Sequence, residues 1–197
     1  MSLMDYDRAI FRKVHALYDE VFFSSPDEAF KTNAKAHNGK VLLPFIAIWR
    51  MPDFSINRDM YNDTYVRHGA RGKTSGVSGV EYPNQVVEMH GLPVTLSYQL
   101  DIYATKREVC DGLAAEVILE MFENPWLIVT ISEMGSDFDM QFTLDVDDSI
   151  SDNTSISEFD DTNRFYRLTV TVVLNEAVIY RISQGKATFE TVEVTIT

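Results

Sequence analysis

The sequence predicts an α+β fold with N-terminal helices and a mostly antiparallel sheet, across which one long helix packs. Three observations support this class: apolar residues at helical spacing near the N-terminus, strict alternation over residues 94–103, and a second helical pattern directly after it. The chain has 197 residues, of which 45% are hydrophobic and 12% aromatic, so a mainly disordered chain is excluded. No repeat or linker divides it, and we expect residues 1–197 to form a single α+β domain.

The first third predicts two helices. Residues 1–4 are interpreted as an artificial addition ahead of a natural start at Met4 and are left out of the fold argument. A helix is expected from Asp5 to about Phe22, with one apolar stripe that contains Ile10, Val14, Leu17 and Val21. Ser25-Pro26-Asp27-Glu28 then predicts a capping-box start for a shorter helix that ends near Gly39.

The next segment has weaker patterns. Residues 41–49 are apolar but contain Pro44, which predicts an edge strand or an extended segment broken at the proline. From residue 51 to 84 no periodicity holds and glycines recur, so we predict a long flexible loop region over 51–84. Loops of this length in compact domains are commonly functional.

A strand, a crossing helix and a second strand are predicted next. Residues 94–103 alternate between apolar and polar side chains, as in a strand of a sheet covered on one side. Thr105 and Glu108 predict a capping box for a helix that ends at Asn124-Pro125. Its expected buried stripe is Val109, Leu113, Val117 and Met121, with Ala114, Ile118 and Phe122 alongside. A buried strand is expected over residues 126–131.

The C-terminal third predicts further strands. One-sided strands are expected over 138–146 and 166–174, separated by an acidic loop over 147–163. Asn175-Glu176 is interpreted as a turn into a strand over 177–182. A turn at 183–186 and a last strand over 188–197 complete the prediction.

The net charge of −13 is unevenly distributed. Residues 1–75 contain 11 basic and 9 acidic residues, residues 76–135 contain 2 and 9, and residues 136–197 contain 4 and 12. The last two segments therefore lack the clustered cations of a nonspecific DNA-binding protein. Charge alone leaves two interpretations open: an ordinary solvated acidic surface, or a surface that nucleic acid passes without adhering.

The glycine-rich segment 69–74 ends in Gly-Lys-Thr but does not fit a phosphate-binding loop. The first glycine of that motif falls on Arg67, and neither a buried strand nor an apolar helix flanks the segment. It is interpreted as a basic loop. Arg67, Arg71 and Lys73, with His68, remain candidates for contact with a partner or a phosphate backbone.

Metal and catalytic patterns are not found. The four histidines are widely separated in sequence: His15, His37, His68 and His90. The acidic segment at 145–149 resembles a calcium loop, but Ile150 and Ile156 occupy its glycine and glutamate positions. We therefore expect no metal and no cofactor.

The single cysteine, Cys110, excludes an intramolecular disulfide framework and fits a reducing compartment. The start of a helix can lower a thiol pKa, but the position of Cys110 beside the expected buried stripe favours a structural role. No nucleophile elbow is present. No apolar run approaches the length of a membrane span, and no secretory leader is visible. We expect no catalytic residues, no enzymatic activity and no membrane partner.

Two segments carry a family resemblance. Residues 92–103 (LPVTLSYQLDIY), followed by Thr-Lys-Arg-Glu at 105–108 and a helix into Asn-Pro-Trp-Leu at 124–127, resemble structural proteins of long-tailed bacteriophages. Residues 43–50 (LPFIAIWR) are similar to a leading segment of the same group. The specific part covers roughly a quarter of the chain, and its motif is a fold pattern with no catalytic signature.

The resemblance implies a tail-completion, tail-terminator or neck protein. Such a subunit forms a ring, often six-fold, contacts other tail or neck proteins and lets DNA pass without tight binding. It is assembled in the bacterial cytoplasm and becomes part of the virion. The length of the 51–84 region departs from the family pattern and leaves the position in tail or neck open. Two other classes remain: a small cytosolic ligand-binding protein or enzyme with a pocket between this loop and the sheet, and an adaptor that adds a strand or helix to another protein.

Overall fold

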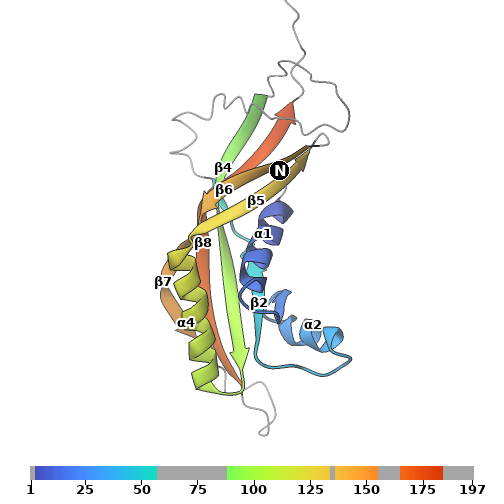
Figure 1. The fold of residues 1–197 in the computed structure, drawn as a ribbon, viewed down its shortest axis with the longest axis vertical. Coiled ribbons are helices and arrows are strands. Elements are labelled where there is room, and N and C mark those ends of the chain that lie inside the picture. The colour runs from blue at the N-terminus through green and yellow to red at the C-terminus, as the bar shows by residue number, and fades with distance from the viewer. Residues whose placement is uncertain (1–2, 57–87, 134–135, 155–164, 184–197) are drawn as a thin grey trace, which may run out of the picture.

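The computed structural model describes residues 3–56, 88–133, 136–154 and 165–183, shown as coloured ribbon in Figure 1. The helices are α1 (Leu3–His15), α2 (Ala29–Ala36) and α4 (Arg107–Glu123). The strands are β1 (Val21–Phe23), β2 (Phe45–Arg50), β3 (Ser55–Ile56), β4 (Glu88–Ala104), β5 (Trp126–Glu133), β6 (Ser136–Thr143), β7 (Asp145–Asp152) and β8 (Tyr166–Ser183). The architecture is α+β, as the sequence predicts.

The main sheet has the order β1-β2-β4-β8-β7, and β3 pairs with β4. Every pairing in it is antiparallel except that of β1 with β2. The two longest strands, β4 and β8, pair along nearly their whole length at the centre. Strands β5 and β6 form a separate two-stranded sheet. The expected strand, helix and strand over 94–131 therefore exist, but the second strand does not join the sheet of the first.

One face of the main sheet is covered by α1, α4 and the β5–β6 pair (Figure 1). The even-numbered residues of β4 point into this core, because side chains alternate along a strand. They are fully buried: Val94, Leu96, Tyr98, Leu100, Ile102 and Ala104. Each of the large side chains among them contributes roughly 1.5–3 kcal/mol through burial, so this core holds both the sheet and the helices in place.

The opposite face is covered near α2 by a second, aromatic cluster. Phe45 and Tyr103 stack with ring centroids 4.7 Å apart, and Phe30 of α2 packs edge-on to both. Phe22 and Phe165 complete the cluster. The alternation over 94–103 predicts one covered face, and the structure corrects this: at this end the sheet is covered on both faces.

Tyr6 connects α1 to β8 at a buried point beyond the end of β7. Strand β7 pairs with β8 only over residues 168–173, and Val178 lies beyond its end, opposite Pro93. The Tyr6 hydroxyl donates to the Val178 carbonyl at 3.0 Å and accepts from the Val178 N–H at 2.7 Å. One buried hydroxyl thus satisfies both backbone groups that a neighbouring strand would otherwise pair.

A charged contact ties the same helix to the middle of the sheet. Asp7 accepts two bonds from Arg50 at 2.9 Å and one from the Tyr98 hydroxyl at 3.0 Å. Burial raises the pKa of Asp7, and the bonds from Tyr98 and Arg50 act in the opposite direction. The cluster therefore fixes the position of α1 more than it stabilises the fold.

Several N-terminal predictions are wrong in their boundaries. Helix α1 begins at Leu3, which packs against the core. It ends at His15 and does not reach Phe22, because the β-branched and aromatic residues Val21–Phe23 form a strand with β2. Helix α2 begins only after Glu28, with no side-chain cap, so the expected capping box at Ser25 does not form. Strand β2 lies between β1 and β4 and is not an edge strand. This is possible because Pro44 precedes the strand, so every residue of β2 has a backbone N–H that can pair within the sheet.

The C-terminal predictions need three further corrections. The segment expected as one strand over 138–146 is divided between β6 and β7, and the first part of the expected acidic loop belongs to β7. Carboxylates suit this strand because β7 lies at the edge of the sheet. The turn expected at Asn175-Glu176 is not formed. Strand β8 continues through these two residues, one more than β4 has between Val94 and Leu96, so the register shifts there. Residues 57–84 of the predicted loop and the predicted strand over 188–197 lie outside the described residues.

Replacing Tyr6 with phenylalanine tests the fastening of α1. Tyr6→Phe leaves the N–H and C=O of Val178 unpaired in a buried place, so we expect the free energy of unfolding to fall by about 1–3 kcal/mol. The measurement is equilibrium urea denaturation followed by circular dichroism. Tyr18→Phe is the matched control, because its half-buried hydroxyl makes a single bond to the Pro44 carbonyl. Equal losses in both variants would contradict the role assigned to Tyr6.

Candidate assembly surface

Helix α4 presents an unusually apolar outer face. It begins at Arg107, after Lys106 in the N-cap position, and no side chain caps it, so the expected Thr105 capping box is not formed. The buried stripe is Cys110, Ala114, Val117 and Met121. Two of the predicted stripe residues, Val117 and Met121, are confirmed, whereas Val109 is exposed and Leu113 only partly buried. Apolar residues occur nearly all round this helix, which is why spacing alone places the stripe wrongly.

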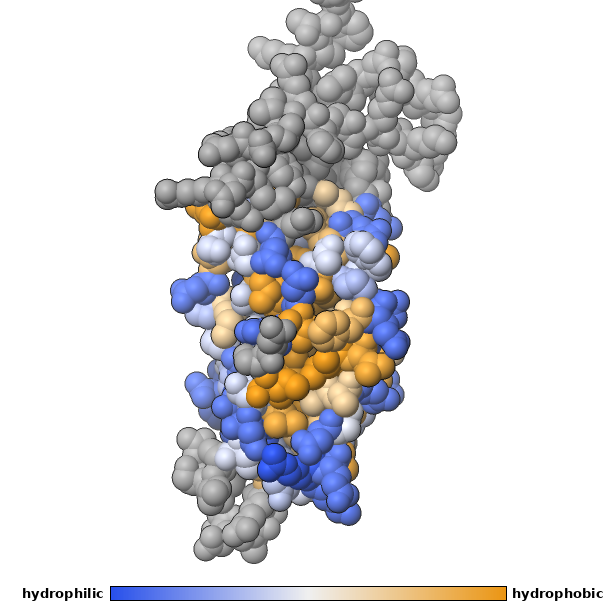
Figure 2. Space-filling view, turned by 90° about the vertical axis from the view of Figure 1, so that its left-hand side faces the viewer, coloured by the Kyte–Doolittle hydropathy of each residue, from blue (hydrophilic) through white to orange (hydrophobic). Residues whose placement is uncertain are grey.

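Five large apolar side chains on and beside α4 are more than half exposed. They are Leu119 (57%), Phe122 (67%), Trp126 (52%), Ile128 (60%) and Ile150 (53%). We call these five residues the α4 surface. Strand β5 was expected to be buried, but only alternate residues such as Leu127 and Val129 point into the core. Figure 2, which faces the side with α4 and β7, shows apolar side chains gathered in a patch across the middle of this side.

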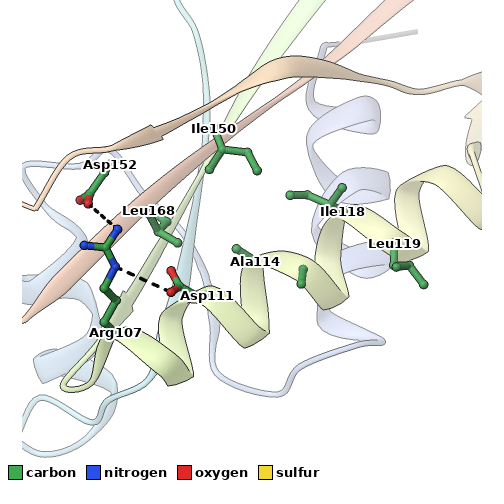
Figure 3. Close-up of a pocket in the computed structure, with 9 residues that line it drawn as sticks. Arg107, Asp111, Ala114, Ile118, Leu119, Ile150, Asp152 and Leu168 are labelled. Carbon is green, nitrogen blue, oxygen red and sulfur yellow. Dashed lines mark ion pairs between the residues drawn. The ribbon is translucent and has the colours of Figure 1, made fainter.

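An open groove runs through this surface between α4 and β7. It has a volume of about 530 Å³ and is lined along α4 by Ala114, Ala115, Ile118 and Leu119 and from the sheet by Ile150 and Leu168. Figure 3 shows Ala114 and Ile118 on the side of α4 that faces Ile150 and Leu168. Leu119 and Phe122 lie on one side of α4, three residues apart. The apolar surface therefore extends along α4 from Leu119, which lines the groove, to Phe122, which does not.

Charged residues close one end of the groove. Arg107 Nη2 lies 3.3 Å from Asp152 Oδ2, and Arg107 Nε lies 3.7 Å from Asp111 Oδ2 (Figure 3). Hydrogen bonds from the side chain and backbone of Thr154 lower the pKa of Asp152, and Arg107 adds to this effect. Because it lies near both Asp111 and Asp152, the Arg107 guanidinium is shared between two carboxylates of the same chain.

The surroundings of the α4 surface are acidic. Residues 107–123 contain one basic residue, Arg107, and five acidic ones, and residues 145–152 contain four aspartates and no basic residue. The side chains of Glu116, Glu123 and Asp147 are exposed. An apolar patch with a charged rim is the usual anatomy of a protein–protein contact.

The most deeply buried charge in the described chain belongs to a closed network. Asp101 accepts bonds from Thr169 Oγ1 at 2.6 Å, from Arg167 Nε at 3.1 Å and from Gln99 Nε2 at 2.9 and 3.0 Å. Asn153 Nδ2 donates to Thr169 Oγ1 at 2.7 Å. The carboxylate is thus satisfied by neighbours on β4 and β8, and we assign it a structural role. Sequence alternation places Asp101 on the polar face and gives no sign of its burial.

The sequence-based candidates lie partly outside the described residues, and those that are described take structural places. Arg67, Arg71 and Lys73, with His68, lie outside the described residues. His15 lies 3.3 Å from the Tyr18 carbonyl and is exposed, and His37 contacts Glu20 at 2.8 Å. Asp145–Asp152 forms strand β7, not a metal-binding loop. Among the described residues no group of three possible metal ligands occurs, and no described helix is long and apolar enough to cross a bilayer.

Comparison with known proteins adds no family. No protein-family model matches the sequence, and no curated protein matches it at a significant level.

Cys110 occupies the structural place that the sequence favours. Its Sγ is fully buried under α4 and lies 3.2 Å from the Ile102 carbonyl. Burial raises the pKa of the thiol, so the thiolate that would act as a nucleophile is disfavoured.

We therefore expect Cys110 to resist Ellman's reagent in the folded protein. At pH 7–8 its reaction should be at least about 100-fold slower than in urea, because the thiol becomes accessible only when α4 opens locally. The measurement is absorbance during labelling, with the unfolded chain as control. Equally fast labelling of folded and unfolded protein would overturn the structural role.

Proposed function

We propose that this protein is a non-enzymatic structural subunit of a bacteriophage or prophage virion. Copies of it form a ring at the head–tail junction or at the tail end, in contact with other tail or neck proteins. The observation that carries the proposal is the α4 surface. Monomeric proteins rarely expose large contiguous apolar patches, and those that do use them in binding.

The arrangement of the resembling segments supports the same assignment. Residues 43–50 include β2, residues 92–103 form most of β4, and the residues that follow form α4 and the start of β5. Strand β2 pairs with β4 along its whole length. The two segments that resemble long-tailed phage proteins are thus neighbours in one substructure, although more than 40 residues separate them in the sequence.

The charge of the chain suits a ring that DNA crosses. With a net charge of −13, the subunit repels phosphates and releases few counterions on contact with a duplex. DNA would pass such a ring without tight binding. The ring would be assembled in the host cytoplasm and retained in the virion.

The groove beside α4 is the place among the described residues where we considered a small-molecule site, the other class of function. Its volume lies within the range of ligand pockets, but it is open along the helix. Its polar groups already pair with one another through Arg107. The same groove leads into the exposed Leu119, so we assign it to protein contact.

Light scattering coupled to size exclusion tests the proposal. Because the α4 surface is covered only on assembly, we expect the mass to rise from one subunit of 22.5 kDa to a closed oligomer as concentration increases, or when purified tail tubes are added. Electron microscopy of the large fraction should show rings. A protein that stays monomeric at every concentration, with tail tubes present, would contradict the assignment.

A further inference from the structure

Two surfaces of different character lie at opposite edges of the main sheet. The α4 surface borders β7, which is the last strand on one edge. Helix α2 packs beside β1, the last strand on the other edge. Figure 1 shows α4 and β7 to the left of the central strands and α2 to the right. A contact between these two surfaces therefore joins different sides of successive copies.

The second surface, which we call the α2 surface, is basic and partly apolar. It consists of Lys31, Lys35, Lys40, Val41 and Leu42, all exposed, with Val41 at 41% and Leu42 at 44%. Asn33 holds the chain after α2 against the helix, since its side chain bonds both the N–H and the C=O of Leu42 at 2.9 and 3.0 Å. Residues 29–42 contain three lysines and no acidic residue.

The charges of the two surfaces are complementary. Glu116, Glu123 and Asp147 are exposed beside the α4 surface, and the lysines of the α2 surface form no ion pair with any residue in the described ranges. Lys31 and Lys35 lie one turn apart on one side of α2 and can face two carboxylates at once. By contrast, two α4 surfaces in contact would bring like charges together, which costs several kcal/mol.

The apolar area also fits a contact between copies. Five side chains at least half exposed present roughly 500 Å² of apolar surface, because a large side chain offers about 150–250 Å² in full. A stable interface buries about 800 Å² per partner, a little more than half of it apolar. The α4 surface alone supplies about that apolar share.

We propose that the α4 surface of one copy binds the α2 surface of the next copy, head to tail. This inference rests on the proposed function and names the contact that builds the ring. A heterologous contact of this kind closes into a ring when the rotation between copies divides a full turn. The apolar residues supply the affinity, and the lysine–carboxylate pairs set the direction in which copies add.

Charge reversal with rescue tests the contact. The first variant is Lys31→Glu with Lys35→Glu, and the second is Glu116→Lys with Glu123→Lys. Each should raise the dissociation constant between copies by roughly 100-fold or more, because like charges then oppose one another. The chain with all four changes should associate again, since complementarity returns with the signs exchanged. Arg8→Glu with Arg12→Glu on α1 is the control for the first variant, because it makes the same charge change at two exposed side chains that belong to neither surface.

The apolar half is tested separately with Leu119→Ser and Phe122→Ser. Both side chains are exposed, so folding should be unchanged by circular dichroism while association, measured by sedimentation, is lost. Loss with these variants but not with the α2 variants would mean a symmetric α4–α4 contact and would overturn the head-to-tail inference. Rings unaffected by any variant would overturn it too and leave the ring function standing. A wild-type chain that never associates would overturn both.

Discussion

The long pairing of β4 with β8 organises the main sheet and both of its faces. Because it runs along nearly the whole of both strands, it divides the residues of β4 between two faces without interruption. The even-numbered side chains build the core that holds α1, α4 and β5–β6, and Asp101 and Tyr103 point to the other face. The extra residue near Asn175 is accommodated within the ladder, and Tyr6 satisfies the backbone of β8 where β7 has ended.

This pairing also separates the two surfaces that we assign to assembly. Strands β1 and β2 extend the sheet on one side of the pair, and β7 extends it on the other. Helices α2 and α4 are therefore held at different edges of one rigid element. A subunit with a basic surface at one edge and an acidic apolar surface at the other is suited to directional addition of copies.

The sequence predicts the α+β class because β4 alternates strictly and α4 ends at Asn124-Pro125, both strong local signals. Prediction from the sequence fails where pairing with a distant strand outweighs the local preference of a segment. Val21 continues a helical stripe and the helix is expected to reach Phe22, yet both residues pair with β2. Asn175-Glu176 has turn composition, yet β4 continues opposite it and keeps β8 extended. The aspartates of β7 indicate a loop, yet an edge strand tolerates them on its solvent side.

The candidate surface is only partly predictable. The abundance of apolar residues on α4 is visible in the sequence, but which of them are buried depends on how α1 and the β5–β6 pair cover the sheet. Phe122 was expected beside the buried stripe and is instead the most exposed of the five. The burial of Asp101 likewise depends on Arg167 and Thr169, more than 60 residues away in the chain. Spacing within one helix or strand carries no information on such partners.

Hydrogen–deuterium exchange during assembly reports on the α2 and α4 surfaces at once. Exchange would be compared between dilute and concentrated protein, peptide by peptide, so that each surface is its own readout. We expect slower exchange on assembly in peptides from α2 with the turn after it and in peptides from α4, β5 and β7, with α1 unchanged. Protection at α4 alone, or protection at neither surface in an assembled ring, would contradict it.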